Sequence, residues 1–128
     1  MRAVDTNVVV RLLVRDDPAQ TAAAERFVSS GAWVSHLVLA ETIWVLDAVH
    51  DVSPAKLARA IELLLEHEQL RLQDSDVVEA ALESFRHSPA LGFSDCLVLE
   101  IARKAGHQPL GTFDRRLAKR PGAARVDG

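Results

Sequence analysis

Two carboxylates follow short apolar segments at positions where a folded chain could use them for metal chemistry. Asp5 comes directly after residues 2–4, and Asp114 comes shortly after residues 109–112. Both segments are predicted to be strands that lead into helices, so both side chains should lie at the carboxyl edge of a parallel sheet, where ligands bind in such folds. Carboxylate oxygens are ligands that Mg²⁺ prefers. Asp is also a favoured helix N-cap, and a cap alone would account for either residue.

Two further carboxylates lie within otherwise apolar segments. Glu41 stands in Val38–Leu46, and if that helix is buried the carboxylate needs a cation, an Arg or a proton, because an unpaired buried charge is costly. The alternative is that Glu41 lies on a solvent-exposed stripe of the helix. Asp95 precedes Cys96–Leu99, where Ser94 is expected to cap the helix and leave Asp95 to point into a cleft. The alternative is an acid in the first helical turn, which the helix dipole favours.

The alternation of strand and helix patterns predicts an α/β domain. Crossover helices between short strands imply a parallel sheet covered on both faces. No repeat or linker interrupts the pattern, so we expect one domain over residues 1–128. The predicted strands are residues 2–4, 32–35, 70–72 and 109–112, with an edge strand at 124–126. The predicted helices are residues 7–14, 18–30, 38–49, 76–85 and 93–105, one that begins at 54, and a short one after Asp114.

Composition fits a soluble protein of the cytoplasm. With 128 residues, 48% of them hydrophobic and 26% charged, the chain can bury a core. Its longest apolar stretch is too short to span a bilayer, and Asp5 and Arg11 interrupt the first apolar run, which excludes a signal peptide. The single cysteine, Cys96, cannot form an internal disulfide and suits a reducing compartment. We expect it to serve packing.

Charge and aromatic residues are distributed unevenly. The segment from Arg103 onward carries seven Lys or Arg against two Asp, whereas the rest of the chain is acidic. A basic end of this kind is either a phosphate-binding face or a solvated helix surface. Trp33, Trp44 and the phenylalanines fall in apolar patterns and are predicted to be core. With no Tyr and 5% aromatics, the chain is not expected to bind single strands by stacking alone.

Four segments resemble motifs of the PIN-domain family. They are Val4-Asp5-Thr6-Asn7-Val8, Leu39-Ala40-Glu41, Phe93-Ser94-Asp95-Cys96-Leu97 and Thr112-Phe113-Asp114-Arg115-Arg116-Leu117. The resemblance covers almost the whole chain and is closest to VapC-type toxins of bacterial toxin–antitoxin pairs. It implies a three-layer α/β/α fold with a short central parallel sheet, and a ribonuclease that depends on Mg²⁺ or Mn²⁺. The implied acidic cluster consists of Asp5, Glu41, Asp95 and Asp114. The polar residues implied to support it are Thr6, Asn7 and Thr112.

The resemblance also implies a mechanism and partners. Asp5 and Asp95 would bind the metal, Glu41 would bind it directly or through water, and Asp114 would hold a second metal or orient the attacking water. A small antitoxin would block the acidic cleft, and the free toxin would pair as a homodimer through exposed apolar helix faces. If the four carboxylates converge without metal, at least one should have a raised pKa. The residues expected to contact RNA phosphates are Arg115, Arg116 and Lys119.

Other classes of function remain open from the residues alone. A phosphatase that uses Asp5 as a covalent nucleophile typically has a second acid two residues on, and here that residue is Asn7. A non-catalytic binding module would use the same acids only as helix caps. Metal nucleases can also cut DNA, and nothing in the sequence excludes that substrate.

Overall fold

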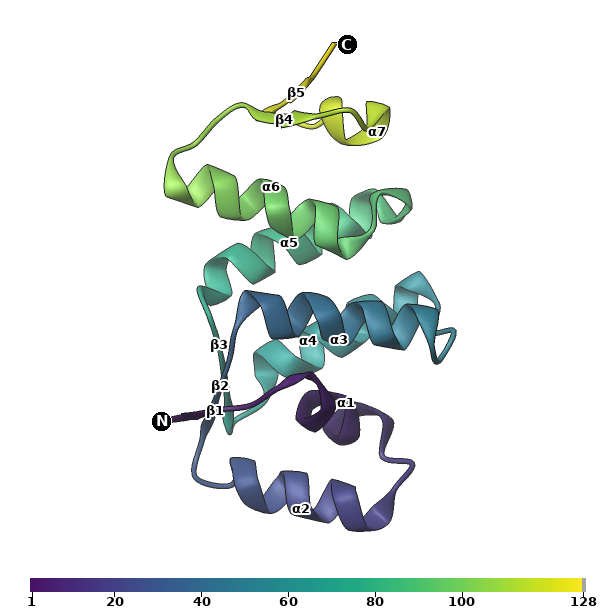
Figure 1. Ribbon diagram of the computed structural model, residues 1–128, viewed down its shortest axis with the longest axis vertical. Coiled ribbons are helices and arrows are strands. Elements are labelled where there is room, and N and C mark those ends of the chain that lie inside the picture. The colour runs from purple at the N-terminus through teal and green to yellow at the C-terminus, as the bar shows by residue number, and fades with distance from the viewer. Residues whose placement is uncertain (128) are drawn as a thin grey trace. The chain divides into compact units, whose positions relative to one another are not determined.

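Short strands and helices alternate along the chain, as the sequence predicts (Figure 1). The structure is a computed structural model that describes residues 1–127, and it divides into unit 1, Met1–Ser75, and unit 2, Asp76–Gly128. The strands are β1 (Arg2–Ala3), β2 (Ala32–Val34), β3 (Leu70–Leu72), β4 (Leu110–Thr112) and β5 (Ala123–Arg125). The helices are α1 (Thr6–Val14), α2 (Pro18–Val28), α3 (His36–Ala48), α4 (Pro54–Glu66), α5 (Ser75–His87), α6 (Phe93–Ala105) and α7 (Arg115–Ala118), with a 3₁₀ turn at Pro89–Leu91.

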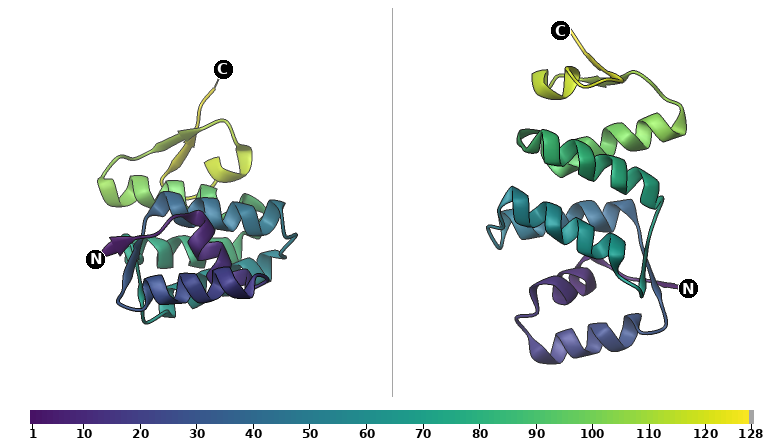
Figure 2. Two further views of the ribbon diagram at one scale, coloured as in Figure 1. Left: turned by 60° about the horizontal axis from the view of Figure 1, so that its bottom comes forward. Right: turned by 180° about the vertical axis from the view of Figure 1, so that it is seen from behind.

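Unit 1 contains a three-stranded parallel sheet in the order β1-β2-β3. Arg2 lies opposite Ala32, and Ala32 lies opposite Leu70, so the three strands start level with one another. Each strand is followed by a helix at its carboxyl end (Figures 1 and 2). This parallel arrangement places the first residues of α1 and α3 at the same edge of the sheet.

Side-chain caps set where the helices of unit 1 begin. Asp5, Asp17, Ser35 and Ser53 each accept a hydrogen bond from the backbone amide three residues ahead, which satisfies one of the free amides of a helix start. Proline follows the cap at the start of α2 and of α4, where its missing N–H costs nothing. The helix start predicted at residues 17 and 18 is therefore confirmed.

The core of unit 1 forms where α1 packs against α2 and α3, and α3 packs against α4. α3 is less buried than its apolar sequence suggests. It buries one face, but Leu37 is 68% exposed and Trp44 is 64% exposed. The prediction that Trp44 belongs to the core is wrong, because an all-apolar helix gives no sequence signal for which face turns inward. The largest fully buried side chains of unit 1 include Leu39, Ile61, Leu64, Val9, Val10 and Val34.

Unit 2 is built from α5, α6, α7 and a two-stranded parallel sheet of β4 and β5. Phe85 of α5 meets Phe93 of α6 edge to face, with ring centroids 6.1 Å apart. Arg120 Nη2 donates a hydrogen bond to Ser84 Oγ at 3.2 Å and so fixes the segment after α7 to α5. α7 packs against both strands. Cys96 is buried, in agreement with its predicted packing role.

The α/β class with parallel strands is confirmed. Every strand pair among the described residues is parallel, and each predicted strand occurs within one or two residues of its expected position. α6 ends at Gly106, whose positive φ of 81° suits a helix terminus that glycine adopts without strain. A membrane-spanning helix would need a longer apolar segment than any helix of residues 1–127 provides.

Candidate active site

The first pair of carboxylates, Asp5 and Glu41, lies in unit 1 where two neighbouring parallel strands end. α1 and α3 follow the carboxyl ends of β1 and β2, and the two helices pack together. As a result, the Thr6 hydroxyl in the first turn of α1 donates a hydrogen bond to Glu41 Oε2 of α3, at 3.0 Å. The Thr6 hydroxyl therefore holds the carboxylate of Glu41 close to the start of α1.

Asp5 caps α1 and is exposed. Its Oδ1 accepts a hydrogen bond from the backbone amide of Val8 at 3.2 Å. A carboxylate offers two oxygens and about four acceptor sites, so one cap bond leaves room for a cation. The cap interpretation is thus correct for Asp5 and is compatible with metal binding. Asn7, the second residue of α1, is exposed.

Glu41 is exposed as well, which decides between its two sequence interpretations. Its helix face also carries Leu37 and Trp44, both exposed. Because the carboxylate is not buried, it does not need a cation to offset a cost of burial. The interpretation that Glu41 lies on a solvent-exposed stripe of the helix is correct. What singles Glu41 out is its contact with Thr6 across two helices.

The second pair, Asp95 and Asp114, lies in unit 2. Asp114 follows β4 and caps α7: its Oδ1 accepts hydrogen bonds from the amides of Arg116 at 2.8 Å and Leu117 at 2.9 Å. The amide of Asp114 itself donates to the Thr112 hydroxyl oxygen at 3.0 Å. Thr112 therefore fixes the backbone that presents Asp114.

Asp95 is the third residue of α6 and is half-buried. Burial raises the pKa of its carboxyl, and the nearby charge of Asp114 raises it further. The expected raised pKa is found at Asp95, where burial is the larger cause and Asp114 the smaller one. The predicted cap at Ser94 is wrong: Gly92, with a φ of 81°, is the N-cap, because the preceding 3₁₀ turn brings the chain into the helix two residues earlier.

The basic residues from Arg103 onward differ in their freedom to bind a ligand. Arg103 is held by the carbonyl of Pro121 at 2.8 Å and by Glu100, and Arg120 is held by Ser84. The three predicted RNA contacts belong to α7 or to its C-cap, and all three are exposed: Arg115, Arg116 and Lys119.

The donor chemistry of both pairs fits a divalent cation. Carboxylate oxygens suit Mg²⁺, and a cation would relieve the repulsion that acts between Asp95 and Asp114. Among residues 1–127, no three His, Cys, Asp or Glu side chains gather in a group that could hold a metal ion. The four acids occur as one pair in each unit.

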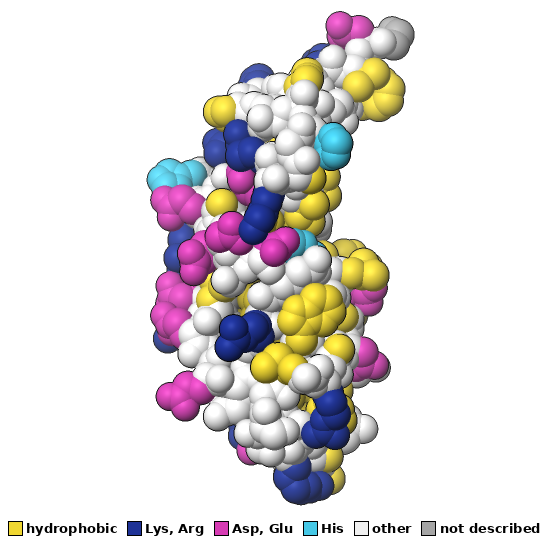
Figure 3. All heavy atoms as spheres, turned by 90° about the vertical axis from the view of Figure 1, so that its left-hand side faces the viewer, with side chains coloured by type: hydrophobic (Ala, Val, Ile, Leu, Met, Phe, Trp, Pro, Cys, Tyr) yellow, Lys and Arg dark blue, Asp and Glu magenta, His cyan; other side chains and the backbone are white. Residues whose placement is uncertain are grey.

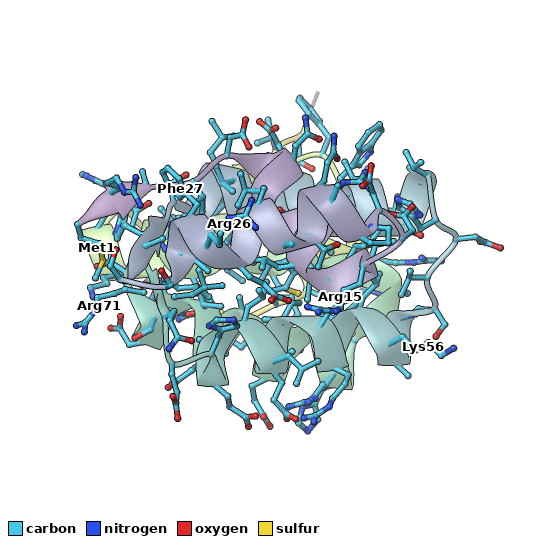
Figure 4. All side chains as sticks on the ribbon, turned by 90° about the horizontal axis from the view of Figure 1, so that it is seen from below. Met1, Arg15, Arg26, Phe27, Lys56 and Arg71 are labelled. Atoms are coloured by element: carbon cyan, nitrogen blue, oxygen red, sulfur yellow. The ribbon has the colours of Figure 1, made fainter. Side chains whose placement is uncertain are left out.

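One cavity of unit 1 lies away from Asp5 and Glu41. A cavity of about 750 Å³ opens between α1, α2 and α4, and its lining includes Leu12, Leu13 and Leu63 but neither Asp5 nor Glu41. Arg15, which is labelled in Figure 4, lines this cavity. Its guanidinium forms an ion pair with the Glu25 carboxylate at 2.6 Å. Glu66 and His67 also line this cavity, but neither belongs to the two pairs of acids.

Phe113 is a surface residue that the sequence interpretation placed in the core. It is 71% exposed, although it stands between two residues that were singled out, Thr112 and Asp114. Its apolar type alone suggested burial. Its position in a turn between a strand and a capped helix was the signal that could have corrected this expectation.

The comparisons with known proteins establish the family. The model of the PIN domain matches residues 2–123, which covers nearly all of the chain and includes both units. The chain belongs to the PIN-domain family. Searches of curated proteins and of solved structures gave no match. Membership brings a nuclease fold, and the activity of this chain follows as a proposal from its own residues.

Proposed function

We propose that this protein is a Mg²⁺-dependent endoribonuclease and the toxin of a toxin–antitoxin pair. The observation that carries the proposal is the placement of Asp5 and Asp114. Each follows the carboxyl end of a parallel strand and is fixed there by backbone amides. In parallel α/β folds this is where ligands bind. The family match includes both units, which supports one nuclease domain.

The proposed site uses the four acids as metal ligands, with Mn²⁺ able to replace Mg²⁺. When bound, the metal lowers the pKa of a water molecule and neutralises charge on the phosphate. Thr6 keeps the Glu41 carboxylate in place through its hydroxyl, and Thr112 keeps Asp114 in place through the backbone. The proposed ligands are Asp5, Glu41, Asp95 and Asp114.

The substrate side of the site is formed by exposed cations. Arg115, Arg116 and Lys119 would bind RNA phosphates that flank the cleaved phosphodiester, whose own charge the metal would neutralise. Water is the proposed nucleophile, so the 2′-hydroxyl is not required. The products should carry 5′-phosphate and 3′-hydroxyl ends.

Partners follow from the family resemblance and from exposed apolar surface. We propose that a small antitoxin blocks the acids by placing an Arg or Lys near Asp5, in the cytoplasm of the host. A homodimer would use apolar helix faces. Such side chains reach the surface in both units, for example Leu37 and Trp44 of α3 and Val98 of α6, and the face in Figure 3 shows several hydrophobic side chains among charged ones.

The activity is tested with purified protein and a mixed pool of RNA. We expect cleavage with Mg²⁺ or Mn²⁺, none with EDTA, and recovery when metal is restored. Sequencing of the ends should show 5′-phosphates and 3′-hydroxyls. Cleavage that continues in EDTA, or products with 2′,3′-cyclic phosphates, would contradict the mechanism.

The toxin assignment has its own test. Expression of the protein in a bacterial host should arrest growth, and co-expression of the neighbouring reading frame should restore it. A matched Asp95→Asn variant, expressed to the same level, should not arrest growth. Normal growth with active wild-type protein would refute the toxin role while leaving the nuclease intact.

A further inference from the structure

Phe113 is an aromatic residue of unit 2 whose ring lies mostly in solvent. The other two phenylalanines of that unit, Phe85 and Phe93, are buried against each other, whereas Phe113 is 71% exposed. Burial of a phenylalanine side chain stabilises a fold, and the exposed ring of Phe113 contributes little of this stabilisation. Its ring face is therefore available to a ligand.

The backbone on both sides of Phe113 is held by hydrogen bonds. The Thr112 carbonyl accepts a hydrogen bond from the amide of Val126 at 2.8 Å, which keeps β4 paired with β5. On the other side, the Asp114 amide donates to the Thr112 hydroxyl oxygen, and the Asp114 carboxylate caps α7. The ring is therefore presented from a fixed turn, so little backbone entropy is lost when a ligand covers it.

The residues beside Phe113 have the charge that a nucleic acid requires. Asp114, the next residue, is a proposed metal ligand, and Arg115 and Arg116 follow it. Consecutive Cα atoms are about 3.8 Å apart, so the ring, the acid and the cations fall within the space of a few nucleotides. An aromatic ring combined with cations that neutralise phosphates is how proteins bind single-stranded nucleic acid.

We propose that Phe113 is a stacking platform for one unpaired base of the RNA, next to the phosphodiester that the acids address. The inference rests on the proposed nuclease function and deepens it by naming the substrate class. A base in a duplex is already stacked on its neighbours, whereas an unpaired base can turn outward from the RNA strand and stack on the ring. Phe113 thus selects single-stranded RNA, and the exposed arginines supply the phosphate contacts.

The test measures binding of a fluorescently labelled ten-nucleotide single-stranded RNA to the full chain in EDTA, where cleavage is off. Phe113→Ala should weaken binding about 5- to 160-fold, which is the value of one base–aromatic stack. Phe113→Trp should bind as well as wild type or better. Phe113→Leu, which keeps an apolar side chain without a ring face, should bind like Phe113→Ala. The salt dependence should be the same in all variants, because the ring contacts no phosphate.

The matched controls separate stacking from general damage. Ile101→Ala removes another exposed apolar side chain of unit 2 and should bind RNA like wild type. RNAs with one abasic position complete the test. At the stacked position, the missing base should weaken wild-type binding by the same factor as Phe113→Ala, and it should cost the Phe113→Ala variant nothing further.

Three results would overturn the inference. If wild type cleaves RNA but all Phe113 variants bind equally, the ring has no role in substrate binding, and the nuclease proposal stands. If Phe113→Leu binds like wild type while Phe113→Ala binds weakly, the ring makes an apolar contact with the RNA and does not stack on a base. If wild type neither binds nor cleaves RNA in any metal, the proposed function and this inference fail together.

Discussion

Asp114 has two separable roles, as the cap of α7 and as a proposed metal ligand. Replacement by Ala removes both roles, because the methyl group neither accepts the amide hydrogen bonds nor binds a cation. Replacement by Asn keeps an acceptor oxygen for the amides of Arg116 and Leu117 and removes only the negative charge. A comparison of the two variants therefore separates structure from chemistry.

The expected magnitude follows from the two cap hydrogen bonds. Loss of an Asp cap to Ala costs about 0.5–2 kcal/mol. For a chain of this length, roughly 3–5 °C of melting temperature correspond to each kcal/mol, so Asp114→Ala should melt roughly 2–10 °C lower than wild type in EDTA. Asp114→Asn should melt at the wild-type temperature or slightly higher, because the repulsion with Asp95 is gone.

The assay combines thermal melts in EDTA and in millimolar Mg²⁺ with RNA cleavage. Mg²⁺ should stabilise wild type, since it binds the folded site, and should stabilise both Asp114 variants much less. Both variants should lose cleavage. The matched control is Asp17, which caps α2 through Gln20 at 3.1 Å and is not one of the proposed ligands. Asp17→Ala should cost similar stability and leave cleavage unchanged.

One result would refute this reasoning. If Asp114→Asn keeps the full Mg²⁺ shift and wild-type cleavage, Asp114 is a helix cap and nothing more. If Asp17→Ala abolishes cleavage too, loss of a cap alone disables the protein, and only Asp114→Asn, which keeps the cap, reports on the metal.

The remaining predictions concern protonation, support and substrate binding. The pKa of Asp95 is raised in the folded state, so below neutral pH the folded protein binds more protons than the unfolded protein. Metal-free protein should therefore become more stable as the pH falls through that raised pKa. Thermal melts across pH should show this gain in wild type and not in Asp95→Asn. Thr6→Val should weaken Mg²⁺ affinity or cleavage about 10- to 100-fold, because the Glu41 carboxylate loses its hydrogen bond. The melting temperature in EDTA should change much less. An unchanged cleavage rate would show that Thr6 does not support the site. The double variant Arg115→Ala, Arg116→Ala should lower the salt slope of single-stranded RNA binding by about 1.4, whereas an unchanged slope would place both arginines on a solvated face.

The elements of the fold were predictable because their signals are local. Asp17 followed by Pro18 is a helix start by capping chemistry alone, and the structure has the helix there. Strand positions followed from short apolar segments between helices. The inward face of α3 was not predictable, because its sequence is apolar on all sides, and only the packing against α1 and α4 decides that Leu39 is buried and Trp44 exposed.

The residues of the candidate site could be named from the sequence, but the physical reasons for naming them were partly wrong. Asp5 and Asp114 were expected at strand ends and are found there, as caps. Glu41 was singled out by an expected burial that does not occur, and the contact that distinguishes it, the hydroxyl of Thr6, joins residues 35 positions apart. The cap of α6 was misplaced because a glycine with positive φ left no side-chain signal. Long-range pairing of this kind cannot be read from local sequence.

We propose that Asp5 and Asp95 are each required for a metal-dependent hydrolysis of RNA. The most direct measurement is the single-turnover rate of RNA cleavage in Mg²⁺ for wild type, Asp5→Asn and Asp95→Asn, with Glu79→Gln as the control, since Glu79 is an exposed acid of α5 outside both pairs. Asp5→Asn and Asp95→Asn should each lower the rate by several orders of magnitude, while Glu79→Gln keeps the wild-type rate. Wild-type cleavage by either Asp variant, with contaminating nuclease excluded, would contradict the claim.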